Sequence, residues 1–234
     1  MFELLRIVTL SFEKTSSDDV SIMVDALRAS TTITLALNNF NRIIPCFTPE
    51  EAFKLKEKYD CIIAGERGGE MIEGFDIGNS PQNVEKYETD KDTLILTTSN
   101  GTRILENMNS TVLVGGMVNA KAVGKKSTLL AKDHIDVVMA GVKGNFALED
   151  FLASGEILYW ICQYSDEYEL NDYAKAAILA SRDYEALKEG FYNCRSGKRL
   201  KGLNHEKDIE CCFSKNITTN VAIYENNELK LIKD

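Results

Sequence analysis

Short apolar runs alternate with amphipathic helical stretches along most of the chain, and this alternation constrains the fold more than any other feature. The runs are rich in β-branched residues or leucine and predict buried strands at 20–25, 43–47, 60–66, 93–98, 111–117 and 135–141. Helical patterns follow at 29–39, 48–58, from 81, 99–108, 119–133, 147–164 and 171–189. Strands that alternate with helices over short links form parallel sheets covered on both faces. We therefore expect a three-layer α/β/α fold.

The C-terminal segment 220–232 departs from this alternation. It reads as two short strands around a turn at Glu225–Asn227, which is the pattern of a β-hairpin. An antiparallel hairpin added to parallel strands makes the sheet mixed but mostly parallel. Because the 234 residues contain no linker and no internal repeat, we expect one domain over 1–234, or two closely packed lobes with the motifs in 20–157.

Charge and composition exclude several classes of function. Lys and Arg total 27 against 36 Asp and Glu, so the net charge is −9, which argues against nucleic acid or an anionic membrane as the main partner. No apolar stretch approaches the roughly 18 residues of a membrane helix, and the N-terminus lacks a secretory pattern. The six scattered cysteines fit reduced thiols. We expect a cytoplasmic protein. A homodimer is the assembly expected on general grounds, because twofold dimers are the commonest oligomers.

Polar or glycine-rich turns follow five of the predicted strands. They are marked by Asp25, Glu66, the segment 98–100, Asn119 and Gly141. In open α/β sheets, ligands bind at the carboxyl ends of the strands. The five turns therefore predict a single site at that edge.

The stretch DALRASTT combines an acid with donors for an anion. A helix start suits a phosphate, and Arg28 with the hydroxyls of Ser30, Thr31 and Thr32 would add donors there. Asp25 would repel such an anion, so it must bind a cation, orient Arg28 or attack phosphorus. The alternative is a helix cap with a structural Asp–Arg pair, which this stretch alone supports equally well.

Two further motifs offer similar chemistry. AGERGG places Glu66 and Arg67 before glycines that let a ligand approach the backbone, and the turn at Asn79 and Ser80 follows it. TTSNGTR supplies a second candidate anion cradle, whose candidate binding residues are Thr98, Asn100, Gly101 and Thr102, with Arg103 nearby. An ordinary Asn-Gly turn with a helix cap is the favoured interpretation of that motif taken alone.

Other candidates differ in strength. Glu149 and Asp150 are adjacent acids at a helix start, where the helix dipole favours them and where a metal would want oxygen ligands. Cys61 and Arg67 have the spacing of cysteine phosphatases, but the residues between them read as a strand rather than a phosphate loop. His134 and His205 fit no metal or triad spacing.

Together the motifs resemble the 2-phosphosulfolactate phosphatases, the ComB family. VDALRASTT, AGERGGEMIEGFDIGNSP, TTSNGTR, GGMVNAKAV and AGVKGNFALEDFLASGEI occur in the family's order between about Val20 and Ile157, and Asp208-x-x-x-Cys stands in for its closing motif. The resemblance implies a Mg²⁺-dependent phosphatase that converts 2-phospho-3-sulfolactate to 3-sulfolactate on the route to coenzyme M. A phosphatase of another small 2-phospho hydroxy acid, or a non-catalytic binder of an anionic metabolite, are the alternatives.

We assign roles on this basis as a hypothesis. Asp25, Arg28, Glu66 and Arg67 are the catalytic candidates, and Mg²⁺ is expected on some of Asp25, Glu66, Glu149 and Asp150. Arg28 and the 30–32 segment would hold the phosphoryl oxygens, while Arg67 and the 98–103 turn would hold sulfonate or carboxylate. Asn79, Ser80 and Asn119 would orient the ligand or a loop. The attacking group is either a water activated by the metal or Asp25 itself.

Overall fold

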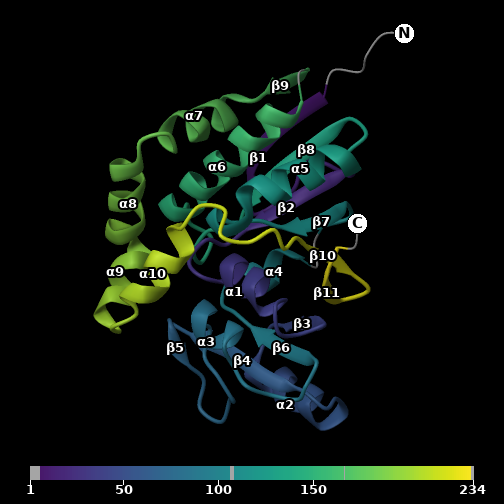
Figure 1. Cartoon of the computed structure of the whole chain (residues 1–234), viewed down its shortest axis with the longest axis vertical. Helices are drawn as coiled ribbons and strands as arrows, with labels where there is room; N and C mark the ends of the chain where they lie inside the picture. The colour runs from purple at the N-terminus through teal and green to yellow at the C-terminus, as the bar shows by residue number, and fades with distance from the viewer. Residues whose placement is uncertain (1–5, 106–107, 166, 233–234) are drawn as a thin grey trace.

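The computed structural model describes residues 6–105, 108–165 and 167–232, and of residues 102 and 103 it describes the backbone alone. Eleven strands form one continuous sheet with helices on both faces (Figure 1). The strands are β1 (Arg6–Phe12), β2 (Val20–Val24), β3 (Arg42–Cys46), β4 (Ile62–Arg67), β5 (Glu70–Met71), β6 (Thr93–Thr97), β7 (Thr111–Val114), β8 (His134–Met139), β9 (Tyr168–Leu170), β10 (Ala222–Glu225) and β11 (Glu228–Leu231). The predicted mixed, mostly parallel α/β/α fold is confirmed.

The helices connect these strands or follow them. They are α1 (Ala29–Ala36), α2 (Pro49–Lys58), α3 (Pro81–Glu85), α4 (Gly101–Leu105), the 3₁₀ turn η1 (Met117–Asn119), α5 (Ala120–Leu130), α6 (Leu148–Tyr164), α7 (Asp172–Ala180), α8 (Tyr184–Asn193), α9 (Arg195–Gly202) and α10 (Glu206–Phe213). The predicted helical pattern over 171–189 is two helices, because Asp183 caps α8 by accepting a hydrogen bond from the Ala186 amide. Within the described residues, no helix combines the length and the apolar character needed to cross a membrane.

The C-terminal hairpin joins two blocks of parallel strands, β4-β6-β3 and β7-β2-β8-β1-β9, and β5 pairs antiparallel with β4 at one edge. Strand order is β5-β4-β6-β3-β11-β10-β7-β2-β8-β1-β9, and β10 and β11 run antiparallel to their neighbours β7 and β3. The turn between them has positive φ at Asn226 and Asn227, which asparagine tolerates better than most residues. The hairpin expected from the sequence is therefore present, and it lies inside the sheet rather than at an edge.

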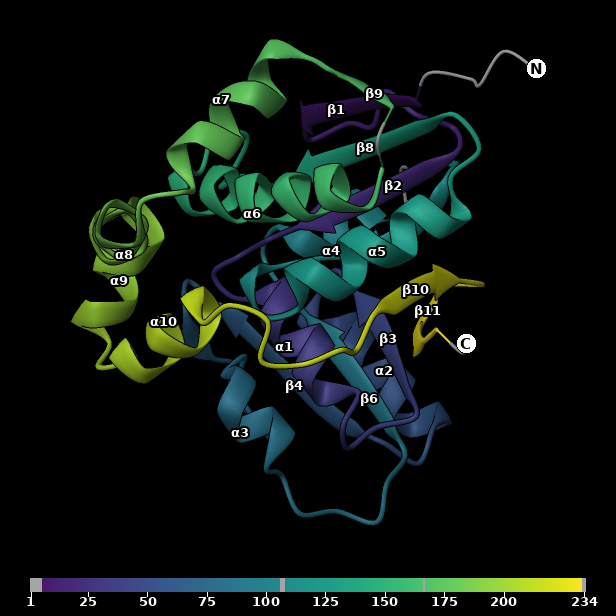
Figure 2. The same ribbon diagram turned by 45° about the horizontal axis from the view of Figure 1, so that its top comes forward.

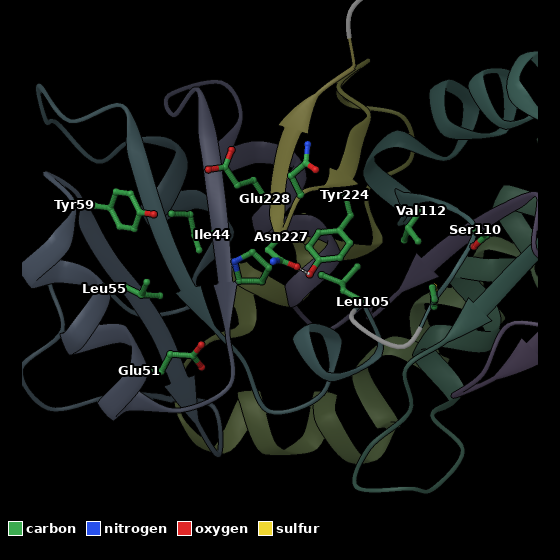
Figure 3. A pocket seen from close by; sticks show the side chains of 13 residues that line it. Ile44, Glu51, Leu55, Tyr59, Leu105, Ser110, Val112, Tyr224, Asn227 and Glu228 are labelled. Carbon is green, nitrogen blue, oxygen red and sulfur yellow. Dashed lines mark hydrogen bonds between the residues drawn. The ribbon is translucent and has the colours of Figure 1, made fainter.

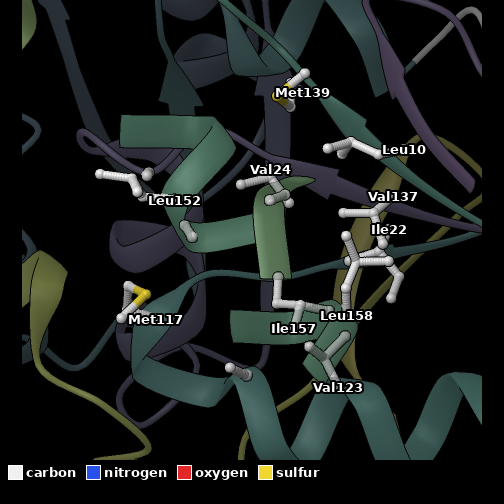
Figure 4. Packing of buried hydrophobic residues seen from close by; sticks show 14 of the residues in the cluster. Leu10, Ile22, Val24, Met117, Val123, Val137, Met139, Leu152, Ile157 and Leu158 are labelled. Carbon is white, nitrogen blue, oxygen red and sulfur yellow. The ribbon is translucent and has the colours of Figure 1, made fainter. Parts of the chain in front are cut away.

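Side chains on successive residues of a strand face opposite layers, and β2 shows this clearly. Ile22 and Val24 pack with Val123 of α5 and Ile157 of α6 in one core cluster (Figure 4). Met23 belongs to a second cluster, which includes the α4 residues Ile104 and Leu105. Because β2 is buried along its whole length, its end is held rigidly for the functional residues that follow it.

The chain after α6 forms a helical flank beside the sheet. Helices α8, α9 and α10 lie together on one side of the molecule, at the left of the view in Figure 1 and again in the rotated view of Figure 2. The sequence did not predict α9 and α10 as elements, and it also missed β1, β5 and β9. This flank brings C-terminal residues to the carboxyl ends of β2 and β4.

Candidate active site

A cavity of about 440 Å³ lies at the carboxyl ends of the strands. It is lined by residues that follow β2, β4, β6 and β8 and by α9: Asp25, Leu27, Arg28, Glu66, Arg67, Gly68, Gly69, Asn79, Thr98, Ser99, Asn100, Val142, Lys143, Ser196, Arg199 and Leu200. We call it the Asp25 cavity. It brings together the four residues proposed as catalytic and three proposed for binding, namely Asn79, Thr98 and Asn100. Of the five strand ends expected to meet, those marked by Asp25, Glu66 and 98–100 line this cavity, whereas Asn119 and Gly141 do not.

Asp25 follows the last residue of β2 and is 6% exposed. Its backbone is fixed by the start of α1, because its amide donates to Ser30 Oγ at 2.9 Å and its carbonyl accepts from the Ser30 amide at 2.9 Å. The carboxylate lies against Gly101 at the start of α4. A Cβ atom on Gly101 would lie 2.9 Å from Asp25 Oδ2, so only glycine leaves room for the carboxylate there.

The pKa of Asp25 is raised to about 7. Burial is the largest cause, and the charges of Glu66 and Glu149 raise the pKa further, against hydrogen bonds from the backbone of Gly101 and Ala29 that lower it. A carboxyl near neutrality suits proton transfer at physiological pH. Part of the shift comes from the neighbouring charges of Glu66 and Glu149, which a bound cation would offset.

Glu66 joins two of the loops around the cavity. Its Oε2 accepts a 2.6 Å hydrogen bond from the Gly69 amide, and its Oε1 accepts from the amide and hydroxyl of Ser99 at 3.0 and 2.8 Å. Gly68 and Gly69 have φ values of +65° and +92°, a conformation that glycine adopts without strain. Glu66 therefore holds the glycine turn against the 98–100 turn.

Arg28 is buried and already engaged by the protein. Its Nη1 donates to Asp208 Oδ2 at 2.6 Å, and its Nη2 donates to the Gly69 carbonyl at 2.8 Å. The other oxygen of Asp208 accepts from Ser80 Oγ at 2.6 Å. Ser80, expected to bind substrate, is thus a partner of the residue that fixes Arg28. Arg28 keeps its positive charge at the cavity, balanced by a carboxylate from α10.

Arg67 bonds mainly to the backbone around it. Its Nη1 donates to the Glu66 carbonyl at 2.7 Å. Its Nη2 donates to the Phe47 carbonyl at 2.5 Å and to Thr97 Oγ1 at 3.1 Å. These bonds tie the end of β4 to β3 and β6, so Arg67 has a structural use that its sequence context did not reveal.

Several predicted binding residues do not line the cavity. Ser30, Thr31 and Thr32 are fully buried within α1, and Thr32 Oγ1 donates to the Asn79 carbonyl at 3.5 Å. These hydroxyls pack inside the fold, which differs from the exposed cradle expected from the sequence. Asn119 is also fully buried, accepting from the Gly116 amide and donating to carbonyls of the core. The side chains of Thr102 and Arg103 lie outside the described part of the chain.

The two acids of α6 lie behind the cavity. Asp150 accepts hydrogen bonds from the amides of Ala26 and Gly141 at 2.8 and 2.9 Å, one on each oxygen, and so fastens the ends of β2 and β8 together. Its pKa is raised well above the usual value by burial and then by the charges of Asp25 and Glu149. Both acids are buried, and neither lines the cavity. Asp150 therefore binds backbone amides with both oxygens, and the metal-binding role expected for it stays a prediction.

Sequence reasoning missed the contributions of α9, α10 and two loops. The cavity-lining residues it did not single out include Ser99, Lys143, Ser196 and Arg199. A signal was present, because the segment 195–201 carries four basic residues in a chain of net charge −9. Asp208 was noted only as part of a closing motif, and nothing local identifies it as the partner of Arg28.

A larger groove of about 740 Å³ lies elsewhere on the molecule (Figure 3). Its walls come from α2, from the region around Leu105 and from the β10–β11 hairpin, with Tyr59 and Tyr224 on opposite sides. Glu51 and Glu228 are its charged lining residues, and none of its described lining residues is a lysine or arginine. It contains none of the predicted site residues and suits an anion poorly.

Comparison with known proteins identifies the family of the chain. The family model described as 2-phosphosulpholactate phosphatase matches residues 7–227. The chain belongs to this family. It is 44% identical over 227 residues, 97% of this chain and 96% of the other, to the 2-phosphosulfolactate phosphatase of Methanothermobacter thermautotrophicus. Probable 2-phosphosulfolactate phosphatases of Clostridium acetobutylicum and Thermotoga petrophila are each 36% identical and cover 93% and 88% of this chain, and 94% and 89% of their own.

The family match confirms the resemblance seen in the motifs and extends it into the C-terminal third. The match continues through α9 and α10, which supply Arg199 and Asp208 to the cavity and to Arg28. In this chain, the Asp25 cavity combines residues from the N-terminal and C-terminal thirds of the sequence.

Proposed function

We propose that the chain is a Mg²⁺-dependent phosphatase that hydrolyses 2-phospho-3-sulfolactate to 3-sulfolactate and phosphate on the route to coenzyme M. The observation that carries the proposal is the buried carboxylate of Asp25 in a cavity that arginines 28, 67 and 199 also line. The substrate carries phosphate, sulfonate and carboxylate groups. A chain of net charge −9 can hold such a ligand only where positive charge is local. The names of the relatives support this choice of substrate.

Asp25 is the group that we place beside the phosphorus. In its ionised form it takes a proton from the attacking water as the water oxygen bonds to phosphorus. It returns that proton to the C2 oxygen as the bond between phosphorus and that oxygen breaks. Without a metal the pKa of this carboxyl is about 7, and a bound cation would lower it, so that the carboxylate form that takes the proton predominates at neutral pH. Arg28, fixed by Asp208, supplies a positive charge that favours the phosphoryl oxygens in the transition state.

The residues present fit a magnesium ion. Asp25 offers a buried carboxylate near Glu66 and Glu149, whose charges raise its pKa. Asn79 also lines the cavity, and its buried side-chain oxygen has no hydrogen-bond partner among the described residues. Within the described residues, no group of three or more acidic, histidine or cysteine side chains is arranged to hold a metal. Mg²⁺ usually takes one or two carboxylates, with water and phosphate oxygens completing its shell. Bound by Asp25 and Asn79, it would neutralise charge on the phosphoryl group.

The test is phosphate release from a panel of small phosphate esters, with Mg²⁺ and after its removal with a chelator. We expect turnover that depends on Mg²⁺ and is fastest with 2-phospho-3-sulfolactate, and we expect Asp25→Asn to abolish it. Faster turnover of a different 2-phospho hydroxy acid would reassign the substrate. No turnover of any ester with the metal present would show a binder of an anionic metabolite instead.

The role of Asp25 has its own test. A single turnover in ¹⁸O-labelled water places the label in the released phosphate when Asp25 acts as the base. Attack by the carboxylate would form an aspartyl phosphate, and water attack at its phosphorus would also label the phosphate. Trapping with a rapid acid quench therefore decides: phosphate recovered on the protein at Asp25 contradicts the proton-transfer role.

A further inference from the structure

Three arginines line the Asp25 cavity within the described residues, and their terminal nitrogens differ in what they bind. Nη1 and Nη2 of Arg28 both donate to protein acceptors, and so do Nη1 and Nη2 of Arg67. Arg199 donates from Nε to the Gly68 carbonyl, and neither of its terminal nitrogens donates to a described residue. Arg199 therefore presents an unengaged guanidinium fork.

The glycine turn after β4 fixes the place of this fork. A Cβ atom on Gly68 would lie 2.1 Å from Arg199 Nη2, so the guanidinium occupies the space where a side chain would otherwise stand. The bond from Nε anchors the near edge of the guanidinium on the turn. Because Glu66 holds the neighbouring Gly69 amide, the surface under Arg199 is itself fixed. A fork placed on a rigid support loses little entropy when it binds an anion.

Burial separates Arg199 from the proposed point of reaction. Asp25 is 6% exposed, whereas Arg199 is an exposed residue of α9. With the phosphate at Asp25, Arg199 meets the part of the substrate that reaches toward the opening. In 2-phospho-3-sulfolactate the sulfur is separated from phosphorus by an oxygen and two carbons. The carboxylate carbon is separated from it by an oxygen and one carbon, so the sulfonate extends farther.

We propose that Arg199 is the specificity-determining residue that binds the sulfonate of the substrate through its two terminal nitrogens. This inference rests on the proposed function and adds the residue that separates a sulfonated ester from its unsulfonated analogue. Sulfonate oxygens accept two parallel hydrogen bonds from a guanidinium, whose planar fork matches a pair of oxygens. Lysine at this position keeps the charge and loses the fork.

The experiment compares kcat/KM for three esters: 2-phospho-3-sulfolactate, 2-phospholactate, which lacks the sulfonate, and 2-sulfoethyl phosphate, which lacks the carboxylate. Arg199→Ala is expected to lower kcat/KM about 10- to 100-fold for the two sulfonated esters and less than about threefold for 2-phospholactate. Arg199→Lys is expected to fall between Arg199→Ala and the wild type. Lys198→Ala is the matched control, because Lys198 is an exposed cation on the same helix outside the cavity lining.

The outcomes separate this inference from the proposed function. An equal loss on all three esters would show that Arg199 only supports the glycine turn, and would overturn the inference while hydrolysis by the wild type still supports the function. A loss confined to the two carboxylate-bearing esters would assign Arg199 to the carboxylate and overturn it as well. A wild type that hydrolyses neither sulfonated ester overturns both proposals.

Discussion

Arg28 and Asp208 are 180 positions apart in the chain, yet Nη1 of the arginine donates a 2.6 Å hydrogen bond to Oδ2 of the aspartate. Their side chains are 3% and 5% exposed. The pair joins the loop after β2 to α10, and the second oxygen of Asp208 binds Ser80 before α3. Residues from three distant segments are thereby fixed around one guanidinium that faces the cavity.

Asp208→Asn is expected to destabilise the protein by about 3 kcal/mol, because it leaves the buried charge of Arg28 without its counter-charge. Urea unfolding measures this change. The control is Asp172→Asn, which breaks the exposed pair of Asp172 with Lys175, whose side chains are 99% and 58% exposed. That change is expected to cost no more than about 0.5 kcal/mol. Equal losses of unfolding free energy in the two variants would show that the buried Arg28–Asp208 pair stabilises the fold no more than an exposed pair does.

Gly101→Ala is expected to lower kcat/KM by about 10- to 100-fold, because a small displacement of a reacting group has effects of this size. The new methyl group would lie 2.9 Å from Asp25 Oδ2 and 3.0 Å from the Cβ of Ala29, so the carboxylate must move. Gly202→Ala is the control, since a Cβ there has no neighbour within 4 Å. Steady-state kinetics of both variants decide, and an unchanged kcat/KM in Gly101→Ala would contradict the geometry.

The sequence predicted the fold well where the pattern is local. The six predicted strands correspond to β2, β3, β4, β6, β7 and β8, and their predicted bounds lie within about three residues of the observed ones. A short β-branched run between polar turns strongly favours a strand over other structures. The hairpin was also predicted. Strand β1 was missed because only two of its seven residues are buried, so it lacks a continuous apolar run. Strand β9 has only three residues, which is too few for a period to be read.

The candidate site was predicted in part for a related reason. Strand ends are visible in the sequence, so Asp25, Glu66 and Asn100 were found and do meet at the cavity. The direction of a side chain is not visible, so the hydroxyls of α1 were assigned to an anion although they point into the core. Arg199 and Asp208 reach the site through tertiary packing of the helical flank, which no local pattern specifies.

Cys61→Ala is expected to leave kcat/KM within about twofold of the wild type. Cys61 lies just before β4 in a buried cluster with Ile63 and Phe75, while Arg67 ends that strand. At about 3.3 Å per residue, the strand holds the two side chains roughly 20 Å apart, so the spacing typical of cysteine phosphatases is not a phosphate loop here. Burial also raises the pKa of the Cys61 thiol, which disfavours a reactive thiolate. A loss of kcat/KM as large as that expected for Asp25→Asn would support a nucleophilic role for Cys61.

Asp25→Asn is expected to change how the stability of the metal-free protein depends on pH. The pKa of Asp25 rises from its ordinary value of 3.8 to about 7 on folding, so the folded protein binds this proton more tightly than the unfolded chain does. The stabilisation from that proton is complete below about pH 4 and is lost as pH rises toward 7. Between pH 5 and 8 the free energy of unfolding of the wild type should therefore fall by about 2–3 kcal/mol more than that of the variant. The variant lacks this fall because asparagine does not titrate in that range.

Urea unfolding of chelator-treated protein at pH 5, 6, 7 and 8 measures this difference, and Asp19→Asn provides a control of opposite sign. Burial raises the pKa of Asp19, but hydrogen bonds from the amides of Asp133, His134 and Lys132 outweigh it and lower the pKa below 3.8. Its contribution is lost only as pH falls through that low value, so the stability difference between Asp19→Asn and wild type should stay constant from pH 5 to 8. A constant difference for Asp25→Asn as well would contradict the raised pKa of Asp25. It would also remove the reason to place proton transfer on this carboxyl.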